Sequence, residues 1–235
     1  MSFIAAWASA VRRLDTDTGD AAVGPQAVSA IGPISILLVG QVVINNGDVI
    51  WSKVILDPEA AGSFAAVALV GRAVFFASWA VLQAAFPAAV AADDHDPGVA
   101  CHAIALVGGV SIAGLGVLAI AAPIVGNVLF GSAMQDANLL LPYAFATVLF
   151  SLANVMATID VAQGRSGLAL LLLGGAVVQT AALMLIAHDA ASLVSVQIAV
   201  MGALLVVVGG SARKLWYNGL TSSLRRGRLR TATAG

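Results

Sequence analysis

Six long apolar stretches constrain the fold of this chain more than any other feature. Each is about 20 residues long, the length of helix that crosses a hydrocarbon core about 30 Å thick. Because lipid offers the backbone no hydrogen bonds, such a stretch must be a helix or a strand of a closed barrel, and unbroken apolar runs lack the alternation of barrel strands. We therefore predict an all-α integral membrane protein, a bundle of six transmembrane helices. The stretches cover residues 30–51, 60–86, 101–124, 139–159, 167–187 and 192–208.

The amino-acid composition agrees with a chain that is surrounded by the hydrocarbon of a membrane. Hydrophobic residues make up 60% of the 235 positions and charged residues 10%, where an ordinary soluble domain carries roughly a quarter charged residues. Short polar gaps such as Asp57-Pro58-Glu59 and Gln163-Gly164-Arg165 separate the stretches, which predicts antiparallel helical hairpins. The predicted organisation is a cytoplasmic amphipathic segment and linker (1–29), a six-helix transmembrane lobe (30–210) and a basic cytoplasmic tail (211–235).

Positive charge gathers at the two ends of the chain. An even number of spans places both ends on one side, and the excess of cations predicts that this side is cytoplasmic, in the plasma or inner membrane. Against this orientation, the acidic loop 93–96 falls on the same side without a basic residue, and Lys53 lies outside. Asp160 is predicted to cap the cytoplasmic end of the fourth span. The terminal cations are Arg12, Arg13, Arg213, Lys214, Arg225, Arg226, Arg228 and Arg230.

Three of the predicted helices carry a polar or aromatic stripe. The spacing i, i+4, i+7, i+11 keeps the members of each stripe within about 60° of arc on a helix. Polar side chains inside a span are costly and tend to face a bundle interior or a wet cavity. The stripes are Gln41, Asn45, Asp48 and Ser52; Arg72, Phe76, Trp79 and Gln83; and Tyr143, Thr147, Phe150 and Asn154, continued by Thr158.

Two interpretations of these stripes stay open. They line a hydrated cavity for an amphipathic solute, or they are the ordinary hydrogen bonding between membrane helices. Asp48 and Arg72 are the clearest charges within the spans. Burying either of them costs much free energy unless it pairs with an opposite charge or contacts water. Asp48 lies near the predicted end of its span and Arg72 about 18 Å into its own, so direct pairing and a shared aqueous cavity are both open.

Enzymatic chemistry has no visible place in the sequence. It contains no metal-ligand spacing, phosphate-binding glycine loop, nucleophile elbow or Ser/His/Asp grouping. We therefore predict no catalytic residues, no metal, no cofactor and no enzyme activity. The basic segment 225–230 is more typical of an orientation signal or an anionic-lipid contact than of a nucleic-acid site, so nucleic acid is not an expected partner.

Several short segments form a recognisable series: Asn46-Gly47-Asp48-Val49-Ile50-Trp51, the run 56–66, Gly71-Arg72, Phe86-Pro87, Phe130-Gly131 with the later Ala137, and Gln163-Gly164-Arg165. This series resembles the polysaccharide biosynthesis flippases, Wzx-like proteins of the multidrug, oligosaccharidyl-lipid and polysaccharide exporter superfamily. Members commonly show an Asp near the outer end of one helix, then an L-x-P/S-E-E-A-G-x-Y turn that opens the next helix, then Phe-Pro. This chain departs in its Ser63-Phe64 pair and in having only Asp57 and Glu59 as acids of the turn.

The resemblance covers residues from about 31 to 208 and matches only the C-terminal lobe of such transporters, which have two six-helix lobes. It implies either a fragment or a half-transporter that pairs with a second six-helix lobe. It also implies that Asp48 and Arg72 govern cavity electrostatics or contact substrate phosphates, and that Phe76, Trp79 and Tyr143 face sugar or isoprenoid.

The function predicted from this resemblance is a membrane transporter lobe that flips lipid-linked saccharides, or exports polysaccharide precursors, by alternating access. The lipid bilayer, the amphipathic substrate and the second lobe are the expected partners. One alternative is a non-transporting membrane scaffold of a glycan-synthesis complex. Another is a small-molecule or drug exporter of the same superfamily.

Overall fold

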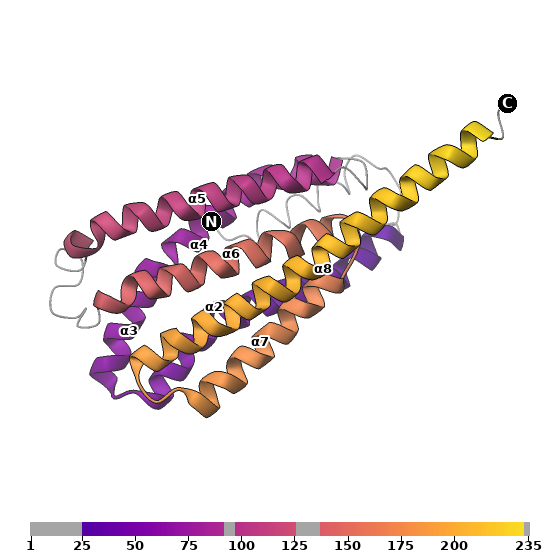
Figure 1. Ribbon diagram of the computed structural model, residues 1–235. Coiled ribbons are helices and arrows are strands. Elements are labelled where there is room, and N and C mark those ends of the chain that lie inside the picture. Colours follow the sequence, from indigo (N-terminus) through magenta and orange to yellow (C-terminus); the bar gives the residue numbers. More distant parts are fainter. Residues whose placement is uncertain (1–24, 92–96, 126–136, 233–235) are drawn as a thin grey trace, which may run out of the picture.

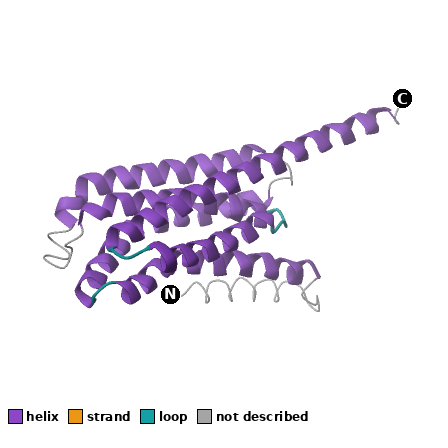
Figure 2. Ribbon diagram, turned by 60° about the horizontal axis from the view of Figure 1, so that its bottom comes forward, coloured by secondary structure: helices purple, strands orange, loops and turns teal. Residues whose placement is uncertain are grey.

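The computed structural model describes residues 25–91, 97–125 and 137–232, and within them the chain is helical without a strand (Figures 1 and 2). Side chains are described over residues 31–84, 101–121 and 138–213. The helices are α2 (Pro25–Ile55), α3 (Pro58–Gly71), α4 (Ala73–Ala91), α5 (Pro97–Val125), the 3-10 turn η3 (Ala137–Leu139), α6 (Leu140–Ala162), α7 (Gly167–Ile186) and α8 (Ala190–Ala232).

The predicted bundle of six transmembrane helices is confirmed. Six helical segments of the described residues are long and apolar enough to cross a membrane, and their mean hydropathies lie between 1.4 and 2.4. The chain is thus a multi-pass membrane protein. The spans are Ile31–Ile55, Pro58–Ala84, Cys101–Ala121, Leu140–Ala162, Gly167–Ile186 and Ala190–Arg213.

Several helix boundaries differ from the expected ones. α2 begins at Pro25, inside the segment predicted as a linker, and continues past Trp51 to Ile55. The second span is interrupted at Arg72, where α3 ends and α4 begins. α8 continues to Ala232 through the predicted tail and projects beyond the other helices (Figure 1). Residues 1–24 and the acidic loop 93–96 lie outside the described part of the chain.

Two of the connections at one end of the bundle are closed by carboxylates that cap a helix. The Asp57 carboxylate accepts the backbone N–H groups of Glu59 at 3.1 Å and Ala60 at 3.0 Å, and Pro58 opens α3. Asp189 and Ser192 exchange similar bonds at the start of α8, at 2.7 and 3.0 Å. The hydrogen bonds from Ser192 lower the pKa of Asp189 below its usual value. Both caps supply partners for N–H groups that a helix start leaves free.

The turn between α6 and α7 corrects the role predicted for Asp160. Its carboxylate does not cap the end of its own helix, whose free groups are carbonyls and not donors. It accepts the backbone N–H of Leu168, at the start of α7, at 3.0 Å and the Nε–H of Arg165 at 2.6 Å. Gly164 makes the turn with a φ of +73°, a conformation that glycine adopts without strain.

α6 lies at the centre of the bundle and contacts α2, α3, α4, α5, α7 and α8. Of the residues in its apolar window 67% are buried, against 22% in α5. Elsewhere small residues let helices approach closely, as membrane helices commonly do. A Cβ at Gly40 would lie 2.7 Å from a Leu172 methyl group, and a Cβ at Gly175 would lie 2.8 Å from a Leu204 methyl group.

Candidate functional site

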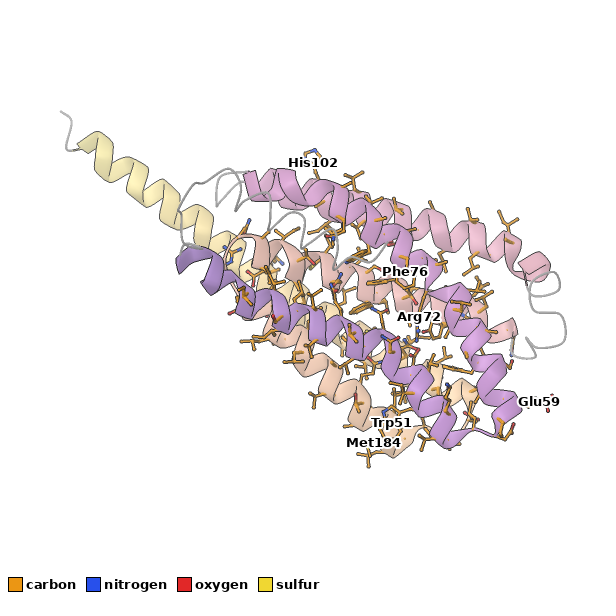
Figure 3. All side chains as sticks on the ribbon, turned by 180° about the vertical axis from the view of Figure 1, so that it is seen from behind. Trp51, Glu59, Arg72, Phe76, His102 and Met184 are labelled. Atoms are coloured by element: carbon orange, nitrogen blue, oxygen red, sulfur yellow. The ribbon has the colours of Figure 1, made fainter. Side chains whose placement is uncertain are left out.

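Two charged side chains meet inside the membrane bundle, where the second span is interrupted. Arg72 is the single residue between α3 and α4, and its Nη2 donates to Oδ1 of Asp48 on α2 at 2.5 Å. The Asp48 side chain is fully buried and the Arg72 side chain is 13% exposed. Figure 3 shows Arg72 at the bend between the two helices. Of the two arrangements left open by the sequence, direct pairing is the one observed.

Tyr143 completes the pair from a third helix. Its hydroxyl group donates to Oδ2 of Asp48 at 2.5 Å and accepts the Nε–H of Arg72 at 2.9 Å. Each of the three side chains therefore bonds to the other two, across α2, α6 and the α3–α4 joint. This closed set of three hydrogen bonds provides partners for two charges that would be costly to bury singly. We name Asp48, Arg72 and Tyr143 the charged triad.

Gly71 provides the space in which the Tyr143 ring lies. A Cβ at position 71 would collide with Cδ1 of Tyr143 and lie 3.1 Å from Cε1. The ring also contacts Phe64 edge-on, with centroids 6.0 Å apart, and Tyr143 is 1% exposed. The absence of a side chain at Gly71 thus lets an aromatic ring lie against the backbone beside Arg72.

The difference in depth expected between Asp48 and Arg72 is smaller in the structure than the sequence indicated. Because α2 continues to Ile55, Asp48 lies two turns from the end of its helix and not one. Arginine spans the rest with its long aliphatic stem. The later end of α2 narrows the gap only in part, because α3 also begins earlier than expected, at Pro58.

A second interhelical contact joins the first and third stripes. Nε2 of Gln41 donates to Oδ1 of Asn154 on α6 at 2.5 Å, and both residues are buried. Asn45 and Thr147, also predicted to line the cavity, bond to backbone carbonyls of their own helices, Gln41 at 3.1 Å and Tyr143 at 3.0 Å. These bonds are the helix-to-helix and side-chain-to-backbone kinds that membrane bundles use.

The α4 stripe beyond Arg72 is less covered. Phe76 is 56% exposed, and Trp79 and Gln83 are half-buried. Trp79 borders a narrow crevice among α4, α5 and α6 that has no room for a water molecule. Its lining residues are Phe75, Ser78, Trp79, Leu82, Val107, Ser151 and Asn154. The hydrated cavity stays a prediction.

Some buried polar residues were missed by the stripe pattern. Gln179 on α7 donates to the Ile44 carbonyl at 3.3 Å, and Ser78 and Ser111 share a bond of 2.7 Å between α4 and α5. The Oε1 atoms of Gln179 and Gln197 have no hydrogen-bond partner among the described residues. All four are amide or hydroxyl side chains within long apolar runs. The rule that intramembrane polar groups face inward would have found them.

The triad can hold a charge pair in hydrocarbon, with 13% of the Arg72 side chain left exposed. Among the described residues no cluster of His, Cys, Asp and Glu is arranged to hold a metal ion. Comparison of the chain with family models, with curated proteins and with solved structures finds no match. The membrane fold and the triad therefore rest on the chain's own residues, and the flippase resemblance remains a prediction.

Proposed function

We propose that this chain is one lobe of a membrane transporter that moves lipid-linked saccharides, or polysaccharide precursors, across the plasma or inner membrane. The observation that carries the proposal is the ion pair of Asp48 and Arg72 inside a membrane bundle. Ionisable residues within spans are expensive, and where they occur they commonly belong to substrate or ion pathways. A purely structural helix contact would need no charge.

The surroundings of Arg72 suit an amphipathic solute. Asp48 and Tyr143 engage two of the five N–H donors of its guanidinium group. Further along α4 follow the exposed ring of Phe76, the half-buried indole of Trp79 and the amide of Gln83. Aromatic faces pack against sugars or isoprenoid, and amides bond sugar hydroxyl groups. Alternating access would arise from rocking of this lobe against a second six-helix lobe about the shared site.

Replacing Arg72 with Ala tests the proposal. In an assembly that flips a fluorescent polyprenyl-linked oligosaccharide in vesicles, Arg72→Ala should abolish flipping while the amount of chain inserted in the membrane stays the same. Lys53→Ala is the matched control, because Lys53 is an exposed cation on α2 and its loss should leave flipping intact. Flipping by Arg72→Ala at the normal rate would refute the site.

A non-transporting scaffold of a glycan-synthesis complex is the second candidate. The observation that favours it is the direct bond between Gln41 and Asn154, which closes the interior where a cavity was predicted. Single cysteines at Asn45, Asp48, Phe76 and Thr147, in a Cys101→Ser chain, separate the two functions. A membrane-impermeant maleimide labels these positions if water reaches them, and a scaffold leaves them unlabelled. A cysteine at Val178, exposed on α7, is the lipid-facing control.

A further inference from the structure

The second span consists of two helices with different packing partners. In α3, Phe64, Val67 and Ala68 belong to a hydrophobic cluster that includes Tyr143 and Leu193. In α4, Val74 close to the joint still belongs to the α3 cluster. Further along α4, Leu82 packs in a separate cluster with Val107 of α5 and with residues Ala103, Val155 and Ile159. α3 also has its own N-terminal cap at Asp57. The α3 helix and the part of α4 around Leu82 are thus anchored in different clusters, and Arg72 lies between them, close to the α4 residue that still packs with α3.

The joint has no proline to explain it. Sharp bends in helices arise at proline, at glycine or serine pairs, or where a side chain inserts. Here Gly71 precedes the break, and the Tyr143 ring occupies the space that a side chain at Gly71 would fill. Arg72 keeps near-helical angles, φ −71° and ψ −15°, and its N–H still bonds to Ala68 at 3.0 Å. The break therefore needs little backbone rearrangement to straighten or bend further.

The charged triad holds this joint against two other helices. Asp48 attaches Arg72 to α2, and the Tyr143 hydroxyl group attaches both charges to α6. Loss of the Tyr143 hydroxyl group would remove two of the three bonds and release the joint from α6, and loss of the Asp48 carboxylate would release it from α2. Hinges in proteins are commonly a few residues at the ends of elements, as Gly71 and Arg72 are.

We propose that the α3–α4 joint is a hinge and that the charged triad is its latch. While the three bonds are made, α3 is held at a fixed angle to α4. When they are lost, α3 turns about Gly71 and Arg72 and changes its angle to α4 at the end of the bundle where α2 and α3 connect. The hinge goes beyond the proposed transport function and does not depend on it, since it concerns only the geometry of this lobe.

Distances between pairs of spin labels across the joint test the hinge. The test pair is Gly62→Cys in α3 with Ala80→Cys in α4, in a Cys101→Ser chain in nanodiscs; both positions are exposed. The control pair is native Cys101 with Ala119→Cys, which spans the same 18 residues within the continuous helix α5. We expect one narrow distance for each pair in the otherwise unaltered chain.

Tyr143→Phe removes the latch hydroxyl group and keeps the ring beside Gly71. It should broaden the test-pair distance or add a second population, displaced on the order of 2–5 Å, and leave the control pair unchanged. Ser78→Ala removes a different interhelical hydroxyl bond, with Ser111, and should change neither distance. An unchanged test pair in Tyr143→Phe, or equal broadening of both pairs, would overturn the proposal.

Arg72→Lys provides a second, independent variant if Tyr143→Phe fails to fold. Lysine keeps the charge but has no forked guanidinium group to bond Asp48 and Tyr143 together. The test pair should broaden in this variant too, with the control pair unaffected. Persistence of a single narrow distance would refute the latch. Because neither measurement involves transport, failure of the hinge and failure of the proposed function are separately visible.

Discussion

The helices α4 and α6 carry polar and aromatic residues at the same spacing, but their surroundings in the bundle differ. α4 has Arg72 before it and then Phe76, Trp79 and Gln83, while α6 has Tyr143, Thr147, Phe150 and Asn154 at the same spacing. All four members of the α6 stripe are at most 4% exposed, whereas Phe76 on α4 is 56% exposed. The difference arises because α6 is surrounded by six other helices and α4 is not. Periodicity identifies a face of a helix, and the neighbours decide what covers it.

The largest expected difference in stability loss is between truncation of Phe150 on α6 and truncation of Phe76 on α4. Phe150→Ala removes a buried ring that stacks on Phe75 at 5.2 Å and should lower the free energy of unfolding by about 3–5 kcal/mol. Phe76→Ala truncates a ring that is 56% exposed and contacts Phe75 edge-on, and should cost about 0.5–1.5 kcal/mol. Unfolding by SDS in mixed micelles measures both. Equal losses would show that Phe76 is covered in the folded protein.

The difference in stability loss should be smaller between the amides of Asn154 on α6 and Gln83 on α4. Asn154→Ala deletes the acceptor of Gln41 and leaves a buried donor unsatisfied, which should cost about 1–3 kcal/mol. Gln83→Ala removes a half-buried amide and should change stability by about 0.5 kcal/mol or less. The same SDS titration applies. If Gln41→Leu combined with Asn154→Leu is as stable as the unaltered chain, the bond serves specificity and not stability.

Thr147 should give the smallest effect although it is buried. Its hydroxyl group donates to the Tyr143 carbonyl of its own helix, and that carbonyl keeps its ordinary helical partner. Thr147→Val keeps the shape and should change the free energy of unfolding by about 0.5 kcal/mol or less. A loss several times larger would indicate that Thr147 has an interhelical role in the membrane.

Much of the fold was predictable from the sequence for a local physical reason. A span in hydrocarbon must satisfy its own backbone hydrogen bonds, so length and apolarity predict a helix without knowledge of its neighbours. The spans, the cap at Asp57 and the turn at Gly164 are all of this kind. The inward placement of Gln41, Asp48 and Asn154 followed from the cost of exposing polar groups to lipid.

The sequence could not predict which of the buried polar groups bond to one another. Asp48 bonds to Arg72 and Tyr143, 24 and 95 residues away, and Gln41 bonds to Asn154, 113 residues away. Those contacts depend on which helices adjoin, on how far α2 continues past Trp51, and on the missing side chain at Gly71 that admits the Tyr143 ring. Local patterns thus determined which groups must avoid lipid, and only tertiary packing decided which of them meet, because complementarity is a property of two surfaces at once.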